Sequence, residues 1–543
     1  MIFIQNLLIF NLLFFSGRGI SLIISKLLNH EHKKYIFGTI HDNLFIVYSL
    51  FFIGNISLIL NFFSPIKNTI MISILSLTIL LNIFKTIKRK EFKFLLLNNF
   101  LIPLVFSFTS LNIGFHYDAA LYHLNFQNWL LNENIIVGLV NIYEPFGLSS
   151  INEYILSNFW FEDNFIFLQS VNIAIMTSLF MFLISSIYFN KSLINKYGSL
   201  FVFFYCFLDN FGFGGGGNGF VSFQGIGKVD LTFSIILFFT LVFYLNIKSQ
   251  KTTETIEYII FINLCLFAVQ LKIFGGLLLF LLIDLIFYIK KRNQWSQIYI
   301  FKISFFSLLI GMFWIFKNFL QTSCFFYPVS FTCFNNTPWY SGTSKLFTEY
   351  TRAFHNAFEY NLNLFKWFDD WLGNQYNQIN LLNFLFSFLV LFLIRSLFFK
   401  KQAKYRNIKL NLFIAFYFIV WLVTSPTPRF FGGIFLILSF LIGSSISSFK
   451  KEKLDEFSKL PIIVLVIIST LTIVRVDSYK KFIEYNFLTP SLSVPIQEYK
   501  QNTNWGVSPV SGELCWVKLN CTETNPQITE TKILLFKGFK KSS

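Results

Sequence analysis

The residue best placed for catalysis is Asp118, which lies just beyond the end of a long apolar stretch. Tyr122, His123 and Trp129 follow it in the segment 114–160, the first long interruption in an otherwise apolar chain. A carboxylate here has two explanations, because it can cap the short helix that the next residues favour or serve as a general base. The spacing alone leaves both open.

Three cations are candidate partners for a phosphate-bearing substrate. Lys272, Lys317 and Arg429 fall at the predicted outer ends of apolar segments, where a charge is costly and usually paired or functional. The planar guanidinium of Arg429 suits phosphate because it can donate two parallel hydrogen bonds. The alternative is that these side chains reach toward water or pair with carboxylates. The carboxylates expected on the same side are Asp118, Asp230 and Glu144.

Further polar residues complete the predicted site. Tyr122, His123 and Asn318 are expected to contact the substrate or its phosphate, and Asp230 or Glu144 is a candidate second acidic residue. Asp230, in GKVDLTF, is equally suited to cap the helix that follows it.

The elements that must position these residues are transmembrane helices. The chain is 54% hydrophobic and only 13% charged, which excludes an ordinary soluble domain. Its net charge of +17 lies mainly in short loops, where the positive-inside rule accounts for it without a nucleic-acid partner. Anionic lipid headgroups at the inner face are the expected partners of those loops.

A crossing needs about 20 apolar helical residues, and by that measure we predict an all-α polytopic membrane protein of about fourteen transmembrane helices. Residues 257–290 are expected to form two helices that meet at an outer turn, and 200–208 crosses only if extended. The other predicted spans are 4–28, 36–62, 68–87, 94–112, 164–188, 230–247, 303–320, 381–399, 410–424, 430–448 and 460–475. Gly17, Arg18 and Gly19 suggest a kink or a break in the first of them.

Loop charge sets the predicted orientation, because basic loops stay on the cytoplasmic side. It divides the chain into N-terminal helices (1–93), a transmembrane core (94–475) and an outer tail (476–543). The long outer loops are 113–163, 211–229 and 321–380. In the first of these, the residues after Asp118 favour a short helix lying in the membrane interface. The glycine-rich loop from Phe211 to Lys228 lacks a Walker-type pattern, so we expect a flexible outer loop that lines a cavity.

The cysteines support this topology. Cys324 and Cys333 are close in sequence within a predicted outer loop, and so are Cys515 and Cys521 in the tail, which predicts two disulfides in an oxidising compartment. Cys206 and Cys265 fall in apolar segments and are expected to be small core residues.

Several motifs resemble bacterial multi-spanning proteins of the GT-C glycosyltransferase superfamily, which use polyprenyl-phosphate-linked sugars. YDAALYHLNFQNWL, containing Asp118, is similar to the acidic motif of their first outer loop. WIFKNFLQTSCFFYPVSFTCF and SPTPRFFGG are similar to outer turns that carry a basic residue. The tail segment ELCWVKLNCT is similar to the cysteine-bearing end of some members.

The resemblance implies a GT-C-like bundle in the bacterial cytoplasmic membrane that transfers a sugar from a polyprenyl-phosphate donor to a glycan, lipid or protein on the outer face. It implies that Asp118 acts as the base or orients the acceptor, with no cofactor. Ala119 stands where better-known relatives have Glu, so a metal-binding acidic pair is not expected there, although a divalent metal is not excluded. The alternatives are a flippase for lipid-linked oligosaccharide and an O-antigen polymerase or ligase. The sequence does not indicate an oligomeric state.

Overall fold

The computed structural model describes residues 2–27, 42–80, 96–109, 114–148, 150–161, 164–190, 192–211, 225–249, 255–291, 297–359, 363–401, 407–449, 492–523 and 526–542. The protein is mostly helical. The first half contains α1 (Ile2–Leu27), η1 (Asp42–Leu44), α2 (Phe45–Asn61), α3 (Asn68–Leu80), η2 (Leu97–Leu101), α5 (Ile102–Thr109), η4 (Ala119–His123), α6 (Leu124–Asn132), η5 (Leu139–Asn141), η6 (Glu144–Leu148), α7 (Ile151–Leu156), η7 (Ser157–Phe159), η8 (Phe165–Phe167), α8 (Leu168–Phe189), α9 (Leu193–Phe211) and α10 (Asp230–Ser249).

In the described part of the second half, the chain adds further helices and six short strands. It contains α11 (Thr255–Leu271), η10 (Ile273–Leu278), α12 (Leu279–Lys291), α13 (Gln297–Thr322), η11 (Ser330–Thr332), α14 (Ser344–Phe354), α15 (Leu364–Leu372), α16 (Gln375–Phe398), β1 (Phe399–Lys401), α17 (Ile408–Thr424), η12 (Pro428–Phe431), α18 (Gly432–Ser444), β2 (Ile446–Phe449), β3 (Tyr499–Gln501), β4 (Val507–Pro509), β5 (Ile528–Ile533) and β6 (Phe536–Lys541).

Among the described residues, five helical segments are long and apolar enough to cross a membrane. They are 3–24, 165–188, 230–249, 304–322 and 375–397. The span in α10 is buried along its whole length, whereas only 22% of the span in α16 is buried. The bundle is therefore built around α10, and α16 presents an apolar surface at the periphery.

Most predicted spans coincide with helices. The stretch 257–290 forms two helical segments that meet at Lys272, as predicted, and the short piece at 200–208 is extended to the 19-residue helix α9. Helix α1 runs continuously through Arg18, so the expected break is not present. The predicted span 460–475 and most of the glycine-rich loop lie outside the described residues.

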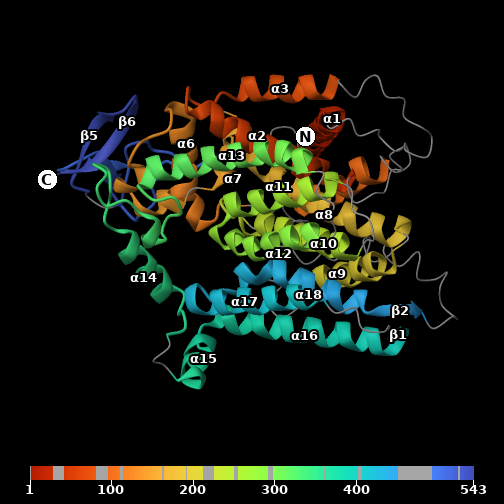
Figure 1. The fold of residues 1–543 in the computed structure, drawn as a ribbon. Helices are drawn as coiled ribbons and strands as arrows, with labels where there is room; N and C mark the ends of the chain where they lie inside the picture. Colours follow the sequence, from red (N-terminus) through yellow and green to blue (C-terminus); the bar gives the residue numbers. More distant parts are fainter. Residues whose placement is uncertain are drawn as a thin grey trace.

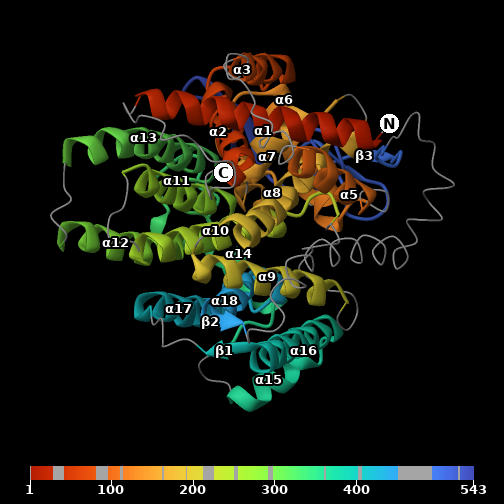
Figure 2. The same cartoon turned by 90° about the vertical axis from the view of Figure 1, so that its right-hand side faces the viewer.

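Contacts gather the predicted outer loops at one end of the bundle (Figure 1). The amide of Gly138 donates to the carbonyl of Leu320 at the end of α13 (2.8 Å), and that of Phe165 donates to Leu492 of the tail (2.9 Å). At the other end β1 pairs with β2. Figure 2 shows the same helices in a view turned by 90°, with α16 at the side of the molecule opposite α3.

The C-terminal tail departs from the all-α prediction. Strands β3 and β4 form one antiparallel pair, and β5 and β6 form a hairpin in which Ile533 is opposite Phe536. The residues between the two isoleucines of ITETKI are polar and mostly exposed, and four of the six residues are β-branched, which favours a surface strand over a transmembrane helix.

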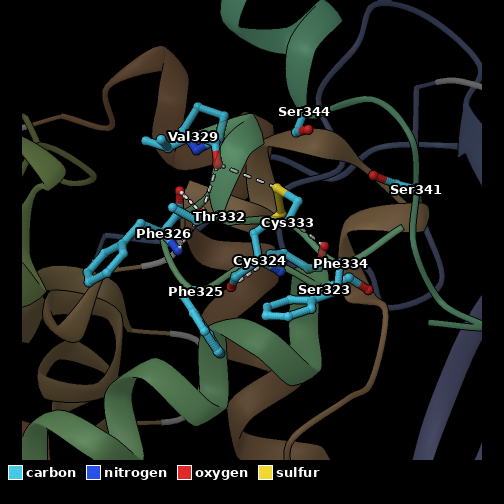
Figure 3. The surroundings of a disulfide bond; sticks show 12 residues. Ser323, Cys324, Phe325, Phe326, Val329, Thr332, Cys333, Phe334, Ser341 and Ser344 are labelled. Carbon is cyan, nitrogen blue, oxygen red and sulfur yellow. Dashed lines mark hydrogen bonds between the residues drawn. A yellow bond between two sulfur atoms is a disulfide. The ribbon is translucent and has the colours of Figure 1, made fainter. Parts of the chain in front are cut away.

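Both predicted disulfides are confirmed. Cys324 is bonded to Cys333 and Cys515 to Cys521. The first closes a turn in which the hydroxyl of Thr332 donates to the carbonyl of Val329 (2.7 Å; Figure 3). Cys206 and Cys265 are free and buried, as expected of core residues.

Close packing of α9 against α18 generates a test of the bundle. A Cβ at Gly443 would lie 2.2 Å from the carbonyl oxygen of Tyr197, whereas one at Gly276 would meet nothing within 4 Å. We expect Gly443→Val to lower the free energy of unfolding by about 1–3 kcal/mol, because the two backbones must move apart. Thermal unfolding of the detergent-solubilised protein measures this. Gly276→Ala is the control, and an equal melting temperature for both variants would contradict the packing.

Candidate functional site

Asp118 is positioned by pairing between two segments that are distant in sequence. The amide of Ile226 donates to the carbonyl of Gly114 (3.1 Å), and that of His116 donates to Ile226 (2.9 Å). Gly227 follows with φ +98°, and a Cβ there would lie 2.6 Å from the Cβ of Ala119. Only glycine combines this backbone conformation with so close an approach. The pairing therefore brings the next residue of the 225–229 segment, Lys228, to Asp118.

Asp118 forms an ion pair with Lys228. The ammonium nitrogen lies 2.9 Å from Oδ2, and only 8% of the Lys228 side chain is exposed. The carboxylate of Asp118 makes no capping hydrogen bond to the η4 turn that follows it. Of the two explanations for this residue, the helix cap is therefore wrong, and the carboxylate is directed toward cations.

A second ion pair forms at Asp230, the first residue of α10. Lys272 donates a hydrogen bond to its Oδ1, and Nε of Arg429 lies 3.8 Å from its Oδ2. The ring of Phe430 packs against both cations, with its centroid 3.8 Å from Nζ of Lys272 and 5.1 Å from Cζ of Arg429. Such contacts stabilise cations that are partly withdrawn from water.

The turn between α11 and η10 places Lys272. A Cβ at Gly275 would lie 2.3 Å from the backbone of Ala268, so the chain doubles back closely on the end of α11. Arg429 lies in η12, which begins with Pro428, a residue whose fixed φ suits the start of a helical turn.

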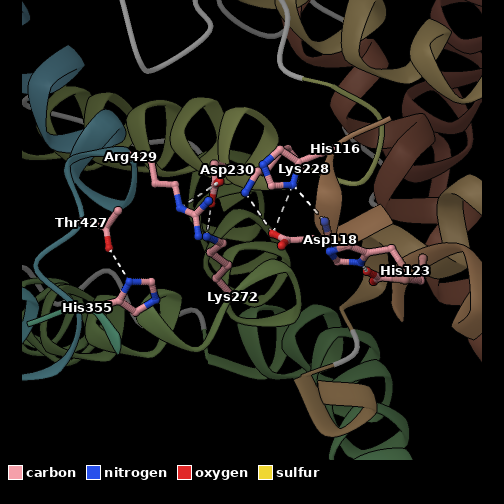
Figure 4. Close-up of polar contacts among 10 residues, drawn as sticks. His116, Asp118, His123, Lys228, Asp230, Lys272, His355, Thr427 and Arg429 are labelled. Carbon is pink, nitrogen blue, oxygen red and sulfur yellow. Dashed lines mark hydrogen bonds and ion pairs between the residues drawn. The ribbon is translucent and has the colours of Figure 1, made fainter. Parts of the chain in front are cut away.

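The two ion pairs form one cluster, which we call the charged cluster: Asp118, Lys228, Asp230, Lys272 and Arg429 (Figure 4). It holds three cations and two carboxylates. Burial alone would raise the pKa of Asp118, but the ammonium of Lys228 outweighs burial and lowers it. Burial and the nearby charge of Arg429 lower the pKa of Lys228, and the negative charge of Asp118 only partly offsets this. The cluster thus holds ionised carboxylates beside an excess of positive charge.

Two histidines border the cluster. The amide of Asp118 donates to Nδ1 of His116 (3.1 Å), so that nitrogen carries no proton. Burial, together with the charge of Lys228, lowers the pKa of His116 to about 4. His355, at the end of α14, contacts the hydroxyl of Thr427 (3.1 Å), and burial and the charge of Arg429 lower its pKa to about 4. Both imidazoles are neutral at pH 7.

The remaining predicted residues lie elsewhere. Lys317 is fully buried, donates to Asn318 (3.0 Å) and packs on the ring of Trp314 at 4.0 Å. Glu144 lies in η6, and its charge acts on Tyr143 and Tyr327.

Tyr122 and His123 follow Asp118 in the η4 turn, and their rings are in contact at a tilt of 37°, with centroids 4.1 Å apart. The charge of Asp118 contributes, after burial, to a raised pKa of Tyr122, so this tyrosine lies near the charged cluster.

Sequence reasoning missed Lys228, His116, His355 and Glu153. Lys228 ends the glycine-rich loop. Its position two residues before Asp230, a candidate site residue, could have indicated that it belongs to the site. Ser150 and Glu153 form a capping box at α7, which is readable from their spacing, but nothing in the sequence indicates that Glu153 also binds His123.

The tail covers the loop that carries Asp118. The amide of Trp516, inside the Cys515–Cys521 loop, donates to the carbonyl of Ala120 (2.8 Å). The hydroxyl of Tyr117 donates to Glu513 (2.6 Å), and Asn128 donates to the carbonyl of Val517 (2.6 Å). These hydrogen bonds hold the residues before, within and after the η4 turn against the tail.

A search of the described residues finds no group of three or more His, Cys, Asp or Glu side chains suited to a metal. Asp118 and Asp230 are each bound by a lysine instead. This arrangement suits an anionic ligand, because a phosphate can be attracted by the cations while a carboxylate accepts a hydrogen bond from a hydroxyl.

Comparison with known proteins gives one family. The family model described as a domain of unknown function (DUF8201) matches residues 1–437. That range contains the charged cluster and ends before the tail. No curated protein and no solved structure matches the chain.

The neutral state of His355 generates a pH prediction. Its pKa is about 4 in the folded protein and near the ordinary 6.5 when unfolded, so the unfolded chain binds more protons between these values. The stability due to this residue is therefore complete above about pH 6.5 and falls as the pH drops toward 4. We expect His355→Gln to reduce the fall in melting temperature between pH 7 and pH 5. Thr427→Val, which removes only its partner, should keep the wild-type slope, and an unchanged slope in His355→Gln would contradict the assignment.

Proposed function

The chain belongs to the DUF8201 family, and we propose that it is a membrane glycosyltransferase that transfers a sugar from a polyprenyl-phosphate donor to an acceptor hydroxyl or amine. The charged cluster carries this proposal. Lys228, Lys272 and Arg429 supply the positive charge that a departing lipid phosphate requires, and Asp118 supplies a carboxylate beside it.

The proposed reaction is a single inverting displacement. The acceptor oxygen forms a bond to the anomeric carbon while the bond from that carbon to the phosphate oxygen breaks and its electron pair leaves with the phosphate. Asp118 takes the acceptor's proton, and the three cations balance the charge that develops on the phosphate. One carboxylate suffices as the base, because no covalent intermediate has to form.

A lipid-linked donor requires the site to lie at the membrane, and the helix surfaces support this. Residues exposed on α16 include Leu385, Leu389 and Phe392, and on α13 they include Phe306 and Met312. Exposed apolar side chains of this size along several long helices are typical of lipid contact. We propose that the protein spans the bacterial cytoplasmic membrane with about fourteen helices.

The charged cluster would then face outside, since it lies at the end of the bundle that carries the disulfides. Within this proposal, α6 is the predicted interfacial helix. Its side chains Phe126 and Trp129 are buried against the protein, so it would lie at headgroup level beneath the tail.

Replacing Asp118 tests the proposal directly. We expect Asp118→Asn to reduce kcat by at least about 100-fold, because the amide cannot take the acceptor's proton. Purified protein would be incubated with a panel of polyprenyl-phosphate-linked hexoses and acceptor glycans, and released polyprenyl phosphate measured.

Glu349→Gln is the matched control, since Glu349 is an exposed acid on α14 whose contact is the neighbouring Lys345. It should retain full activity. Full activity in Asp118→Asn would show that the proposed site is wrong.

Arg429 generates a separate prediction. Lysine keeps the charge but loses the planar fork, so we expect Arg429→Lys to raise the donor KM roughly tenfold, the equivalent of one charged hydrogen bond. Steady-state kinetics with varied donor at saturating acceptor measures this. Lys540→Arg, an exchange on the exposed surface of β6, is the control. An unchanged donor KM in Arg429→Lys would remove Arg429 from phosphate binding.

A further inference from the structure

A buried polar pair, His123 and Glu153, lies close to Asp118. Nδ1 of His123 is 2.6 Å from Oε1 of Glu153, and both residues are almost fully buried. The pair joins the η4 turn to α7, two elements that are 30 residues apart in sequence. Capping α7 accounts for Glu153 but not for a histidine bound to it beside a catalytic candidate.

Glu153 is held as a fixed anion. Its Oε2 accepts hydrogen bonds from the amide of Ser150 (2.8 Å) and from the hydroxyl of Ser150 (2.7 Å), while Oε1 faces His123. Burial would raise the pKa of Glu153, but its hydrogen bonds with His123 and Ser150 lower it overall. An ionised carboxylate at Nδ1 requires that nitrogen to carry the proton, so a proton arriving from Asp118 can be taken only by Nε2.

The η4 turn directs His123 toward Asp118. It is a π-type turn, in which the amide of Leu124 bonds to the carbonyl of Ala119, five residues earlier. Such a turn is wider than an α-helical one, so residues five apart come closer to the same face than they would in an α-helix. Asp118 and His123 are five apart. Figure 4 draws their side chains next to each other, and the two groups are close enough to interact electrostatically.

We propose that His123, oriented by Glu153, is a proton-relay residue that receives from Asp118 the proton taken from the acceptor. This inference rests on the proposed glycosyl transfer and deepens it. Glu153 is a positioning residue, because it acts only through the imidazole. The arrangement solves a chemical problem, since Asp118 beside Lys228 is a weak base and would not hold the proton after transfer.

Every proton and electron pair in the proposed relay is accounted for. The acceptor's proton moves to a carboxylate oxygen of Asp118 as the new bond to the anomeric carbon forms and the phosphate leaves. It then moves to Nε2 of His123, which becomes an imidazolium paired with the Glu153 carboxylate. Loss of that proton to water restores both groups for the next turnover.

The groups facing His123 are few. Glu153 approaches from α7, Asp118 and Tyr122 lie on its own segment, and Lys317 of α13 acts electrostatically on Glu153. Of these, Tyr122 has a pKa raised well above its usual value, because it is buried and close to two carboxylates. Asp118 and His123 are therefore the two groups between which the proton would pass.

The test is His123→Gln in the full-length protein, assayed with polyprenyl-phosphate-linked hexoses. We expect kcat to fall by about 100-fold with the donor KM within twofold of wild type. In the wild type, the pH profile of kcat should depend on both Asp118 and the imidazole that receives its proton. The variant lacks that imidazole, so its pH profile of kcat should differ from that of the wild type.

Two further variants separate a relay from a structural pair. Glu153→Gln keeps the size of the side chain but removes its charge, so it should lower kcat and displace the pH profile. Phe126→Leu loosens the packing of α6 on Tyr154 of α7, where the rings are 6.4 Å apart, without altering an ionisable group. It should lower the melting temperature and leave the pH profile of kcat unchanged.

Full kcat and a wild-type pH profile in His123→Gln would overturn the relay alone. A loss of kcat that only follows the loss of melting temperature, as calibrated by Phe126→Leu, would assign the pair a structural role and also overturn it. If the wild-type protein releases no lipid phosphate from any donor, the proposed function fails and the relay fails with it.

Discussion

Burial of the Asp230 carboxylate at the first turn of α10 is the constraint on which the end of the bundle that carries the charged cluster depends. A buried carboxylate must be paired, and here the partners come from two other elements, Lys272 from the α11–η10 turn and Arg429 from η12. Satisfying one charge therefore fixes three elements relative to one another. The segment that precedes Asp230 is fixed as well, and through Lys228 it sets the position of Asp118.

Much of this arrangement could be predicted, because a charge at the end of an apolar segment is visible in the sequence. Asp118, Asp230, Lys272 and Arg429 were all identified in this way, and they meet in the charged cluster. Lys317 gave the same signal but packs on Trp314 and donates a hydrogen bond to Asn318. Loop charge reveals how far along the bundle a residue lies, whereas the direction it faces around the helix depends on packing. Lys228 was missed because it reaches Asp118 through the pairing of its segment with residues 114–116. No local sequence pattern indicates that pairing.

The fold, like the site, has parts that the sequence predicts and parts that it does not. Runs of apolar residues predicted the helices, because an apolar environment requires such runs, and α9 differs in continuing through polar residues at both of its ends. The strands of the tail were not anticipated, since they are short and one of them, β6, also bridges to Val137, which is distant in sequence. The disulfides were predictable because their cysteines are close in sequence.

The bond between Asn125 and the carbonyl of Lys518 joins residues 393 positions apart, and its partner lies inside the Cys515–Cys521 loop. This bond has a consequence for biogenesis. The loop carrying Asp118 is made early in translation, yet the residues that hold it in place are made almost four hundred residues later. Assembly of the site must therefore wait for the late part of the chain to be synthesised and for its disulfide to form. A nascent chain stalled before that point would contain every residue of the charged cluster and still lack the contacts that fix Asp118.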